Sequence, residues 1–158
     1  MVFKNNILKQ INLFFKKQSM KKKSLSAKKK IHNKLLINLK NPLIYKIYKD
    51  FNNFVKFNLS KSRFSVAVSG GTDSLALAYF SKCYSISNNI KVEYYHVDHK
   101  LRKESSIEAK KLKLLLKKFD IKCKILKWNG QKPKSNIQSI ARIKRYDLIY
   151  KECLKNKL

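Results

Sequence analysis

Cysteine, proline and glycine are all scarce in this chain of 158 residues, which has three cysteines, two prolines and three glycines. Cys83, Cys123 and Cys153 lie 30 or more residues apart and form no C-x-x-C pair. This spacing argues against a zinc site and against a disulfide framework. Reduced thiols are expected, and with them a cytoplasmic protein.

Long apolar runs are also missing. No stretch of 18 apolar residues occurs, so the sequence predicts no membrane span and no membrane partner. The amino-terminal stretch lacks an apolar region followed by a small-residue cleavage site, which argues against a secretory signal. Organelle presequences are typically rich in arginine, and this stretch has none, but an organelle stroma or matrix stays open as an alternative location.

Acidic residues number nine, against 38 lysines and arginines, so the formal net charge is +29. Residues 1–49 hold 14 lysines and no acid. Such an excess predicts attraction to polyanions such as RNA, with an affinity that falls as salt rises. An AT-rich genome would produce a similar composition, and both explanations stay open. The low complexity of residues 1–40 predicts a basic extension that is flexible or loosely helical.

Apolar residues recur at helical and strand spacings from Pro42 onwards. They predict helices over about 42–58, 74–84, 106–119 and 136–155, and strands at 64–68, 91–97 and 121–127. Ser105 with Glu108, and Ser135 with Gln138, have the spacing of capping boxes. The alternation of strands and helices predicts the α/β class, with a Rossmann-like parallel sheet in a domain over 41–158.

Two of the three glycines stand together between a predicted strand and a predicted helix, in S-G-G-T-D-S at 69–74. Glycine permits positive φ and close approach of a ligand, and the turn amides at the start of a helix favour phosphate. We therefore expect the amides of Gly70 and Gly71 to face a polyphosphate. The stretch lacks the lysine of a GTPase-type P-loop and does not spell G-x-G-x-x-G. A tight turn capped by Ser74, with no ligand, stays open as an alternative.

S-G-G-T-D-S resembles the signature of the ATP pyrophosphatases, the PP-loop enzymes, which cleave ATP between the α and β phosphates to adenylate a substrate. Two further stretches resemble the tRNA(Ile)-lysidine synthases within that superfamily. They are H-V-D-H-K-L-R at 96–102, followed by E-S-S-I-E-A-K, and N-I-Q-S-I-A-R-I-K-R-Y at 136–146. The three matches come in the family's order and cover about 64–150.

The resemblance implies an ATP-dependent carbon–nitrogen ligase that converts the wobble cytidine of a tRNA(Ile) with a CAU anticodon to lysidine. ATP would adenylate the cytosine oxygen at C2, and free lysine would then displace AMP. ATP and Mg²⁺ are the implied cofactors, and Asp73 and Asp98 the implied catalytic residues, with Asp73 also a candidate Mg²⁺ ligand. The implied phosphate-binding residues are Ser69, Gly70, Gly71, Thr72, Asp73 and Ser74.

Four more residues are candidates for contacts with substrate or RNA: His99, Arg102, Arg142 and Arg145. Asp98 and His99 follow the second predicted strand at its carboxyl end, where ligands bind in open α/β sheets. A turn held by hydrogen bonds to the next helix would also explain this pair.

Arg142 and Arg145 belong to the stretch that resembles the family's A-R-x-x-R-Y element. They are expected either to contact a nucleotide or tRNA phosphate, or merely to pair with Asp147 or Glu152. Trp128 and the tyrosine pair at 94 and 95 are expected to pack in the core and not to stack on bases.

The sequence departs from the family at two points. Lys100 replaces the usual glycine, which is tolerable if that loop does not need positive φ. The family also continues with another strand and an acidic element, whereas this sequence stops at Leu158. The nucleotide of a doubly wound sheet sits between the first and fourth strands, so the first strand here is expected to form an open edge. We therefore expect a truncated or split synthase that does not complete the reaction alone, with a second polypeptide or self-association completing its sheet.

Two other functions stay open. A PP-loop tRNA thiolase has the same fold, but thiolases that use a cysteine pair or an iron–sulfur cluster need spaced cysteines that this sequence lacks. A basic RNA-binding remnant without catalysis is favoured by the charge and by the missing half of the sheet.

Overall fold

The computed structural model describes residues 25–59, 63–130 and 135–158. Three parallel strands form one sheet in the order β1-β2-β3, with bounds Phe64–Ala67, Val92–Asp98 and Cys123–Lys127. Phe64 pairs with Val92, and Tyr94 with Cys123. The predicted α/β class and parallel sheet are confirmed, and β1 is an edge strand among the described residues.

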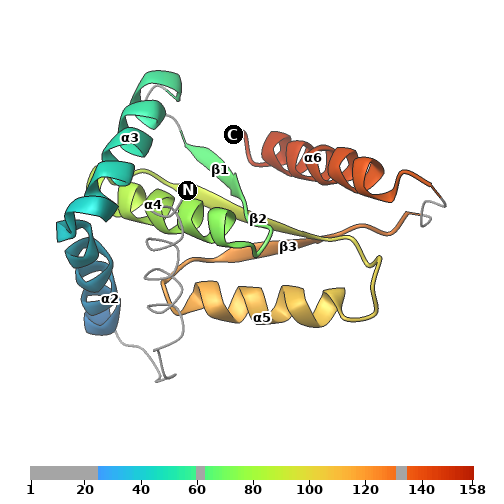
Figure 1. The fold of residues 1–158 in the computed structure, drawn as a ribbon, viewed down its shortest axis with the longest axis horizontal. Coiled ribbons are helices and arrows are strands. Elements are labelled where there is room, and N and C mark those ends of the chain that lie inside the picture. The colour runs from blue at the N-terminus through green and yellow to red at the C-terminus, as the bar shows by residue number, and fades with distance from the viewer. Residues whose placement is uncertain (1–24, 60–62, 131–134) are drawn as a thin grey trace.

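Helices cover both faces of this sheet (Figure 1). After β1 and β2 come α4 (Thr72–Asn88) and α5 (Ser105–Lys117), which lie on one face, while α6 (Ile137–Lys155) lies on the other. Before β1 come α2 (Leu25–Ile37), a 3-10 turn at Asn38–Lys40 and α3 (Pro42–Asn58). None of the helices in the described ranges is long and apolar enough to cross a membrane.

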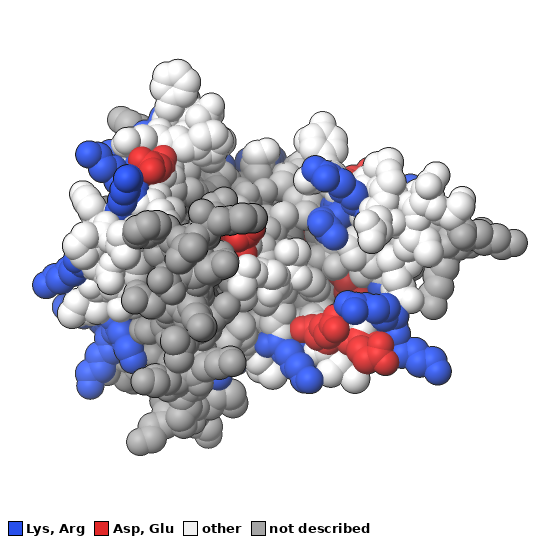
Figure 2. Space-filling model, viewed as in Figure 1, with Lys and Arg blue, Asp and Glu red and all other residues white. Residues whose placement is uncertain are grey.

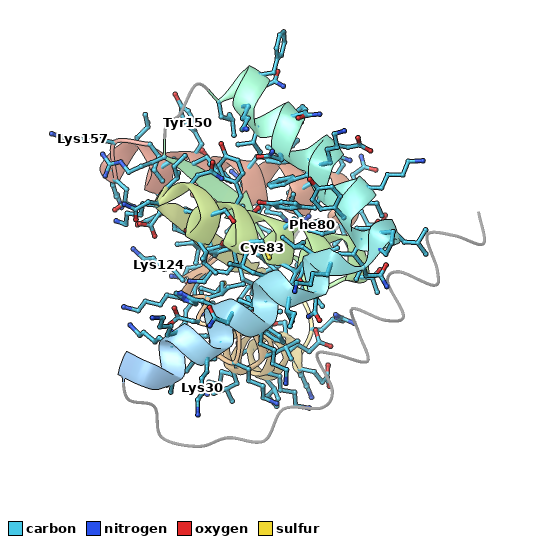
Figure 3. The ribbon with its side chains drawn as sticks, turned by 90° about the vertical axis from the view of Figure 1, so that its left-hand side faces the viewer. Lys30, Phe80, Cys83, Lys124, Tyr150 and Lys157 are labelled. Atoms are coloured by element: carbon cyan, nitrogen blue, oxygen red, sulfur yellow. The ribbon has the colours of Figure 1, made fainter. Side chains whose placement is uncertain are left out.

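The larger core lies between the sheet and the helices α2 to α5. Alternate residues of β1, Phe64 and Val66, point into it because side chains on a strand alternate between the two faces. Phe80 of α4 packs against Tyr48 and Phe51 of α3 at centroid distances of 6.0 and 6.2 Å. Figure 3 shows Phe80 within the molecule, where it holds α3 against α4.

A smaller core lies under α6 on the other face of the sheet. Tyr95, Val97 and Leu126 of the strands are buried there together with Ile149 of α6. The hydroxyl of Tyr95 accepts a hydrogen bond from Asn156 at 3.1 Å, just beyond the end of α6. These contacts fix α6 beside the carboxyl ends of β1 and β2.

The segment before Pro42 differs from the expected flexible extension wherever the structure describes it. Leu35 of α2 is only 1% exposed, and its carbonyl accepts a hydrogen bond from the Tyr79 hydroxyl at 2.7 Å. His32 Nε2 lies 2.9 Å from the Asp120 carboxylate. The packed fold therefore begins before residue 40, and the part of the proposed extension at residues 1–24 lies outside the described residues.

Both predicted capping boxes are wrong. Glu104 is the N-cap of α5 and makes no side-chain cap hydrogen bond, because Ser105 donates to Asp98 instead. At the start of α6 the N-cap is Asn136, in the left-handed region with φ 49°, again without a side-chain cap hydrogen bond. Tertiary hydrogen bonding has displaced the local cap at α5.

Lys100 lies in the left-handed region, with φ 52°. The loop after β2 therefore does need positive φ. Lysine at position 100 is consequently strained, contrary to the condition under which we expected it to be tolerated. Its amide donates to Asp98 Oδ1 at 3.0 Å, and its Nζ donates to Asn129 Oδ1 at 3.0 Å. These two bonds hold a conformation that costs a residue with a Cβ about 1–2 kcal/mol.

Replacing Leu35 with alanine should lower the free energy of unfolding by about 2–5 kcal/mol, because it removes a fully buried side chain. Urea denaturation followed by circular dichroism measures the change. Lys30→Ala on the same helix is the matched control, since Lys30 points into solvent (Figure 3) and should have little effect. A Leu35→Ala variant as stable as the control would show that α2 does not belong to the folded core.

Replacing Lys100 with glycine should raise the free energy of unfolding by up to about 1 kcal/mol, since glycine adopts positive φ without strain but is more flexible when unfolded. Lys103→Gly is the control, because Lys103 is exposed in the same loop and is not among the residues with positive φ. A loss of stability at Lys100→Gly as large as the control's would contradict the strain argument.

Candidate functional site

The turn at 69–74 joins β1 to α4 at the carboxyl edge of the sheet. The main chain of β1 is held up to this point, since the amide of Val68 donates to Tyr95 at 2.8 Å and His96 Nδ1 donates to the carbonyl of Val68 at 2.7 Å. Gly70 has φ 96°, a conformation that side chains oppose. The turn thus starts from a fixed strand end and needs glycine at its second position.

Ser74 organises the inside of this turn. Its Oγ accepts hydrogen bonds from the amides of Ser69 at 3.2 Å and Gly70 at 3.1 Å, and donates to the carbonyl of Gly71 at 2.9 Å. The expectation that the amides of both glycines face a polyphosphate is therefore wrong for Gly70, whose amide is bonded within the turn. The amides of Gly71, Thr72 and Asp73 form no hydrogen bond within the described part of the chain, and they stand at the start of α4, where the helix dipole favours an anion.

Gly71 distinguishes a ligand-binding turn from a merely structural one. Its φ of −72° and ψ of 163° suit any residue. A Cβ added there would meet only the Ser69 hydroxyl, at 3.8 Å, which is ordinary contact. The fold itself therefore does not require glycine at 71, whereas a phosphate seated on the amides at the start of α4 would require the space that a Cβ fills.

Asp73 lies exposed in the first turn of α4. No group of three or more metal-ligating side chains occurs among the described residues, so the protein by itself offers no preformed cation cage there. Mg²⁺ commonly takes one or two carboxylates and completes its coordination with water and substrate phosphates. A single exposed carboxylate beside a phosphate-sized turn fits that pattern.

A cleft of about 1700 Å³ opens at the carboxyl ends of β1 and β2, between α5 and α6. Ser69 and Gly70 line it, so the turn meets the cleft at its first two residues. The cleft also brings together all the predicted residues that lie outside the turn: Asp98, His99, Arg102, Arg142 and Arg145.

Asp98 has both carboxylate oxygens engaged and is only 2% exposed. Oδ1 accepts from Ser105 Oγ at 2.8 Å and from the amide of Lys100, and Oδ2 accepts from Ser106 Oγ at 2.6 Å. Burial alone would raise the pKa of Asp98, but the hydrogen bonds from Ser106, Ser105 and the Lys100 amide outweigh it and lower the pKa. The carboxylate stays ionised and ties the loop after β2 to the start of α5, which matches the hydrogen-bonded turn left open above.

His99 is held in one tautomer by Arg145. Arginine only donates, so at 3.3 Å His99 Nε2 must accept, and the ring proton sits on Nδ1. That buried Nδ1 has no hydrogen-bond partner in the described ranges. Burial and the charge of Arg145 lower the pKa of His99, so the ring is neutral at pH 7. Trp128 packs edge-on against it, at a centroid distance of 6.4 Å.

The two arginines of α6 do not form the ion pairs that the sequence left open. Asp147 pairs with Lys151 at 3.0 Å and Glu152 pairs with Lys124, so neither acid neutralises an arginine. Arg142 instead lies over the ring of Tyr146, 5.8 Å from its centroid.

Arg102 alone among the predicted cationic residues is ion-paired, with Glu108 at 2.9 Å. Both side chains are exposed, so this pair is easily exchanged for another partner. Figure 2 shows Lys and Arg side chains over α6 and around the start of α5, with the acidic side chains of that end gathered near α5. The α6 side of the cleft therefore carries the unneutralised positive charge.

His96 and Tyr146 contribute to the site but had no assigned role from the sequence. His96 secures the end of β1, and Tyr146 lines the cleft beside Arg142. The role of His96 could have been predicted, because alternation along β2 puts it on the same side of the sheet as Asp98. The role of Tyr146 could not, because no periodicity in the sequence marks an exposed residue of a helix. Trp128 and the tyrosines 94 and 95 are buried, which confirms that they pack.

The sequence matches known proteins over the same region. The PP-loop domain family matches residues 41–158. Relatives with the name tRNA(Ile)-lysidine synthase are 41% identical over 92 residues in Bartonella henselae, 38% over 105 in Rickettsia rickettsii and 43% over 95 in Bartonella tribocorum. The matches cover 57%, 66% and 59% of this chain, but only 19%, 22% and 19% of those relatives.

The chain therefore spans about a fifth of the length of the curated relatives it matches. The family match covers the whole of the site described above, from the turn at 69–74 to the arginines of α6. On this match, and with a parallel sheet whose first turn has the expected glycine pair, the chain belongs to the PP-loop domain family.

Proposed function

We propose that this chain provides the ATP-binding part of a tRNA(Ile)-lysidine synthase, an ATP-dependent carbon–nitrogen ligase. The observation that carries the proposal is Gly71, whose missing side chain neither its backbone angles nor its neighbours require and which leaves room for a phosphate at the start of α4. The names of the relatives support tRNA(Ile) as the substrate. The CAU anticodon and free lysine come from the resemblance of the three motifs.

In this proposal the triphosphate of ATP lies on the amides of Gly71, Thr72 and Asp73. These donors and the positive end of the α4 dipole stabilise the charge that develops when pyrophosphate leaves. Ser74 keeps the turn in shape, and its hydroxyl is able to rotate toward a phosphate oxygen. Asp73 is the residue we assign to Mg²⁺, which would supply charge neutralisation for the phosphates.

The target cytosine and the adenosine would share the cleft between α5 and α6. The guanidinium of Arg145 presents donors to a nucleotide, and the neutral ring of His99 beside it adds no second positive charge. Asp98 takes a positioning role, because its low pKa and fully engaged oxygens make it a poor proton acceptor. Asp73 remains the catalytic carboxylate of the proposal.

The thiols favour a ligase over a thiolase that uses cysteine. Burial raises the pKa of Cys83 to about 12 and the pKa of Cys123 to about 11, so neither forms a thiolate nucleophile at neutral pH. Cys153, the third thiol, belongs to α6; its Sγ lies 3.2 Å from Ser65 Oγ, and the residue does not line the cleft. The alternative, an RNA-binding remnant without a nucleotide site, predicts that ATP gives no protection of the turn at 69–74.

The two glycines should respond to alanine in opposite ways. Gly71→Ala should leave the free energy of unfolding nearly unchanged but abolish protection of residues 69–75 by MgATP in hydrogen exchange. Gly70→Ala should be destabilised by about 1–2 kcal/mol, because φ 96° disfavours a side chain. MgATP protection of Gly71→Ala equal to the wild type's would overturn the phosphate site.

The ligase assignment is tested by exchange with a relative. The matching segment of the Bartonella henselae synthase is replaced by that of this chain, and ATP-dependent incorporation of labelled lysine into tRNA(Ile) is measured. We expect incorporation by the chimera and none by the same chimera with Gly71→Ala. A folded chimera that binds MgATP but incorporates sulfur from a donor, or nothing, would refute the assignment.

A further inference from the structure

Two tyrosines of α6 are exposed next to the cleft. Tyr146 lines the cleft and is 56% exposed, and Tyr150, one turn further along the helix, is 64% exposed. Figure 3 shows Tyr150 at the surface of the molecule. Together with Arg142, which precedes Tyr146 by one turn, they form a row that leads from the cleft outwards; we call it the α6 row.

The surroundings of the α6 row are cationic. The Arg142 guanidinium lies 5.8 Å from the Tyr146 ring centroid, so one face of that ring already has a planar cation beside it. Lys144 is exposed on the same helix and forms no ion pair among the described residues. The two acids of α6 are both ion-paired, Asp147 with Lys151 and Glu152 with Lys124. The row thus combines exposed rings with an excess of positive charge.

The spacing of the row suits an unstacked strand. Residues four apart on a helix are about 6 Å apart along its axis, whereas bases of a duplex strand repeat every 3.4 Å or so. Two neighbouring bases can therefore stack on Tyr146 and Tyr150 only if the bases are unstacked from each other, as in an extended single strand. Proteins that bind single-stranded RNA typically combine aromatic side chains, on which the bases stack, with a positively charged groove for the backbone.

We propose that the α6 row is a stacking platform for single-stranded RNA, on which nucleotides flanking the target base lie as they leave the cleft. The proposal deepens the proposed function and rests on it in taking RNA as the ligand. Tyr146 receives the base nearest the cleft and Tyr150 the next one. Arg142 and Lys144 then lie near the phosphates that join them.

A protein partner is the other occupant that exposed side chains on α6 would fit, since Ile143 and Leu154 are also exposed. Charge decides between the two. A protein surface would have to bring acids to this helix, whereas RNA supplies a phosphate for each nucleotide and matches the net charge of +29. The buried aromatics cannot serve the same purpose, because Trp128, Tyr94 and Tyr95 have no exposed ring face to offer.

The test measures binding of fluorescein-labelled oligouridylate, and of an RNA duplex of equal length, by fluorescence anisotropy over a range of salt. Tyr146→Ala should weaken single-strand binding by about five- to a hundred-fold, the loss expected for one stacked base. The slope of affinity against salt should stay unchanged, because a tyrosine releases no counterions. Binding of the duplex should also stay unchanged, since its bases are not accessible.

Three matched variants keep the result specific. Tyr146→Phe should bind as the wild type does, because the ring is retained. Tyr45→Ala should also bind as the wild type does, because Tyr45 is a comparably exposed tyrosine, at 52%, but lies on α3. Arg142→Gln should lower both the affinity and the salt slope, by about one unit in the slope.

Wild-type affinity of Tyr146→Ala, or an equal loss at Tyr45→Ala, would overturn the proposal. So would sedimentation showing a concentration-dependent dimer that Tyr146→Ala abolishes, since the row would then be a protein contact. MgATP protection of residues 69–75 is measured on the same samples. Wild-type RNA affinity of Tyr146→Ala with intact ATP protection refutes only the α6 row, whereas absent ATP protection together with the expected loss of RNA affinity in Tyr146→Ala refutes the ligase and leaves the row standing.

Discussion

The parallel pairing of β1 with β2 is the constraint on which the site depends. It ends with the amide of Val68 bonded to Tyr95, and His96 adds a second bond to the carbonyl of Val68. Because parallel strands place their carboxyl ends at one edge, the turn after β1 and the loop after β2 open side by side. Every later feature, from the free amides at the start of α4 to the cleft under α6, is positioned by where these two strands stop. A shift in their register would disturb the core residues of both strands and the alignment of the two loops together.

The two loops at this edge adopt positive φ with different residues, glycine in the first and lysine in the second. The turn after β1 has Gly70 at a positive φ, which favours glycine, and Gly71 at a position whose backbone angles and neighbours would admit a side chain. The loop after β2 has lysine in a left-handed conformation, held by bonds from its amide to Asp98 and from its amine to Asn129. The first loop thus keeps space open, and the second is held closed by side chains. In the proposed function the first loop receives the phosphates, while the second loop lines the cleft with His99.

The sequence was sufficient for everything that depends on periodicity and chain order: the alternation of strands and helices, the parallel sheet and the glycine turn. It was insufficient wherever a residue far along the chain decides. Leu35 is buried by α4, so the lysines around it did not reveal a core helix. Ser105 has the spacing of a cap but bonds Asp98 of the preceding strand. Gly70 and Ser74 are only four residues apart, yet the bond that occupies the Gly70 amide depends on the rotamer of a hydroxyl, which no pattern of letters encodes.

The positive charge, which composition alone left between RNA binding and codon usage, is not uniform in its physical setting. On α2 the lysines surround a helix that buried contacts hold at the far end from the cleft, and α2 itself contains no phenylalanine, tyrosine or tryptophan. On α6 the cations Arg142 and Lys144 stand near exposed tyrosines and form no ion pair in the described part of the chain, because Asp147 pairs with Lys151 and Glu152 with Lys124. Codon usage supplies lysine without regard to its neighbours, whereas an RNA site requires cations and rings together and acids kept apart. By that criterion the charge on α6 calls for a functional explanation, whereas the charge on α2 does not by itself call for one.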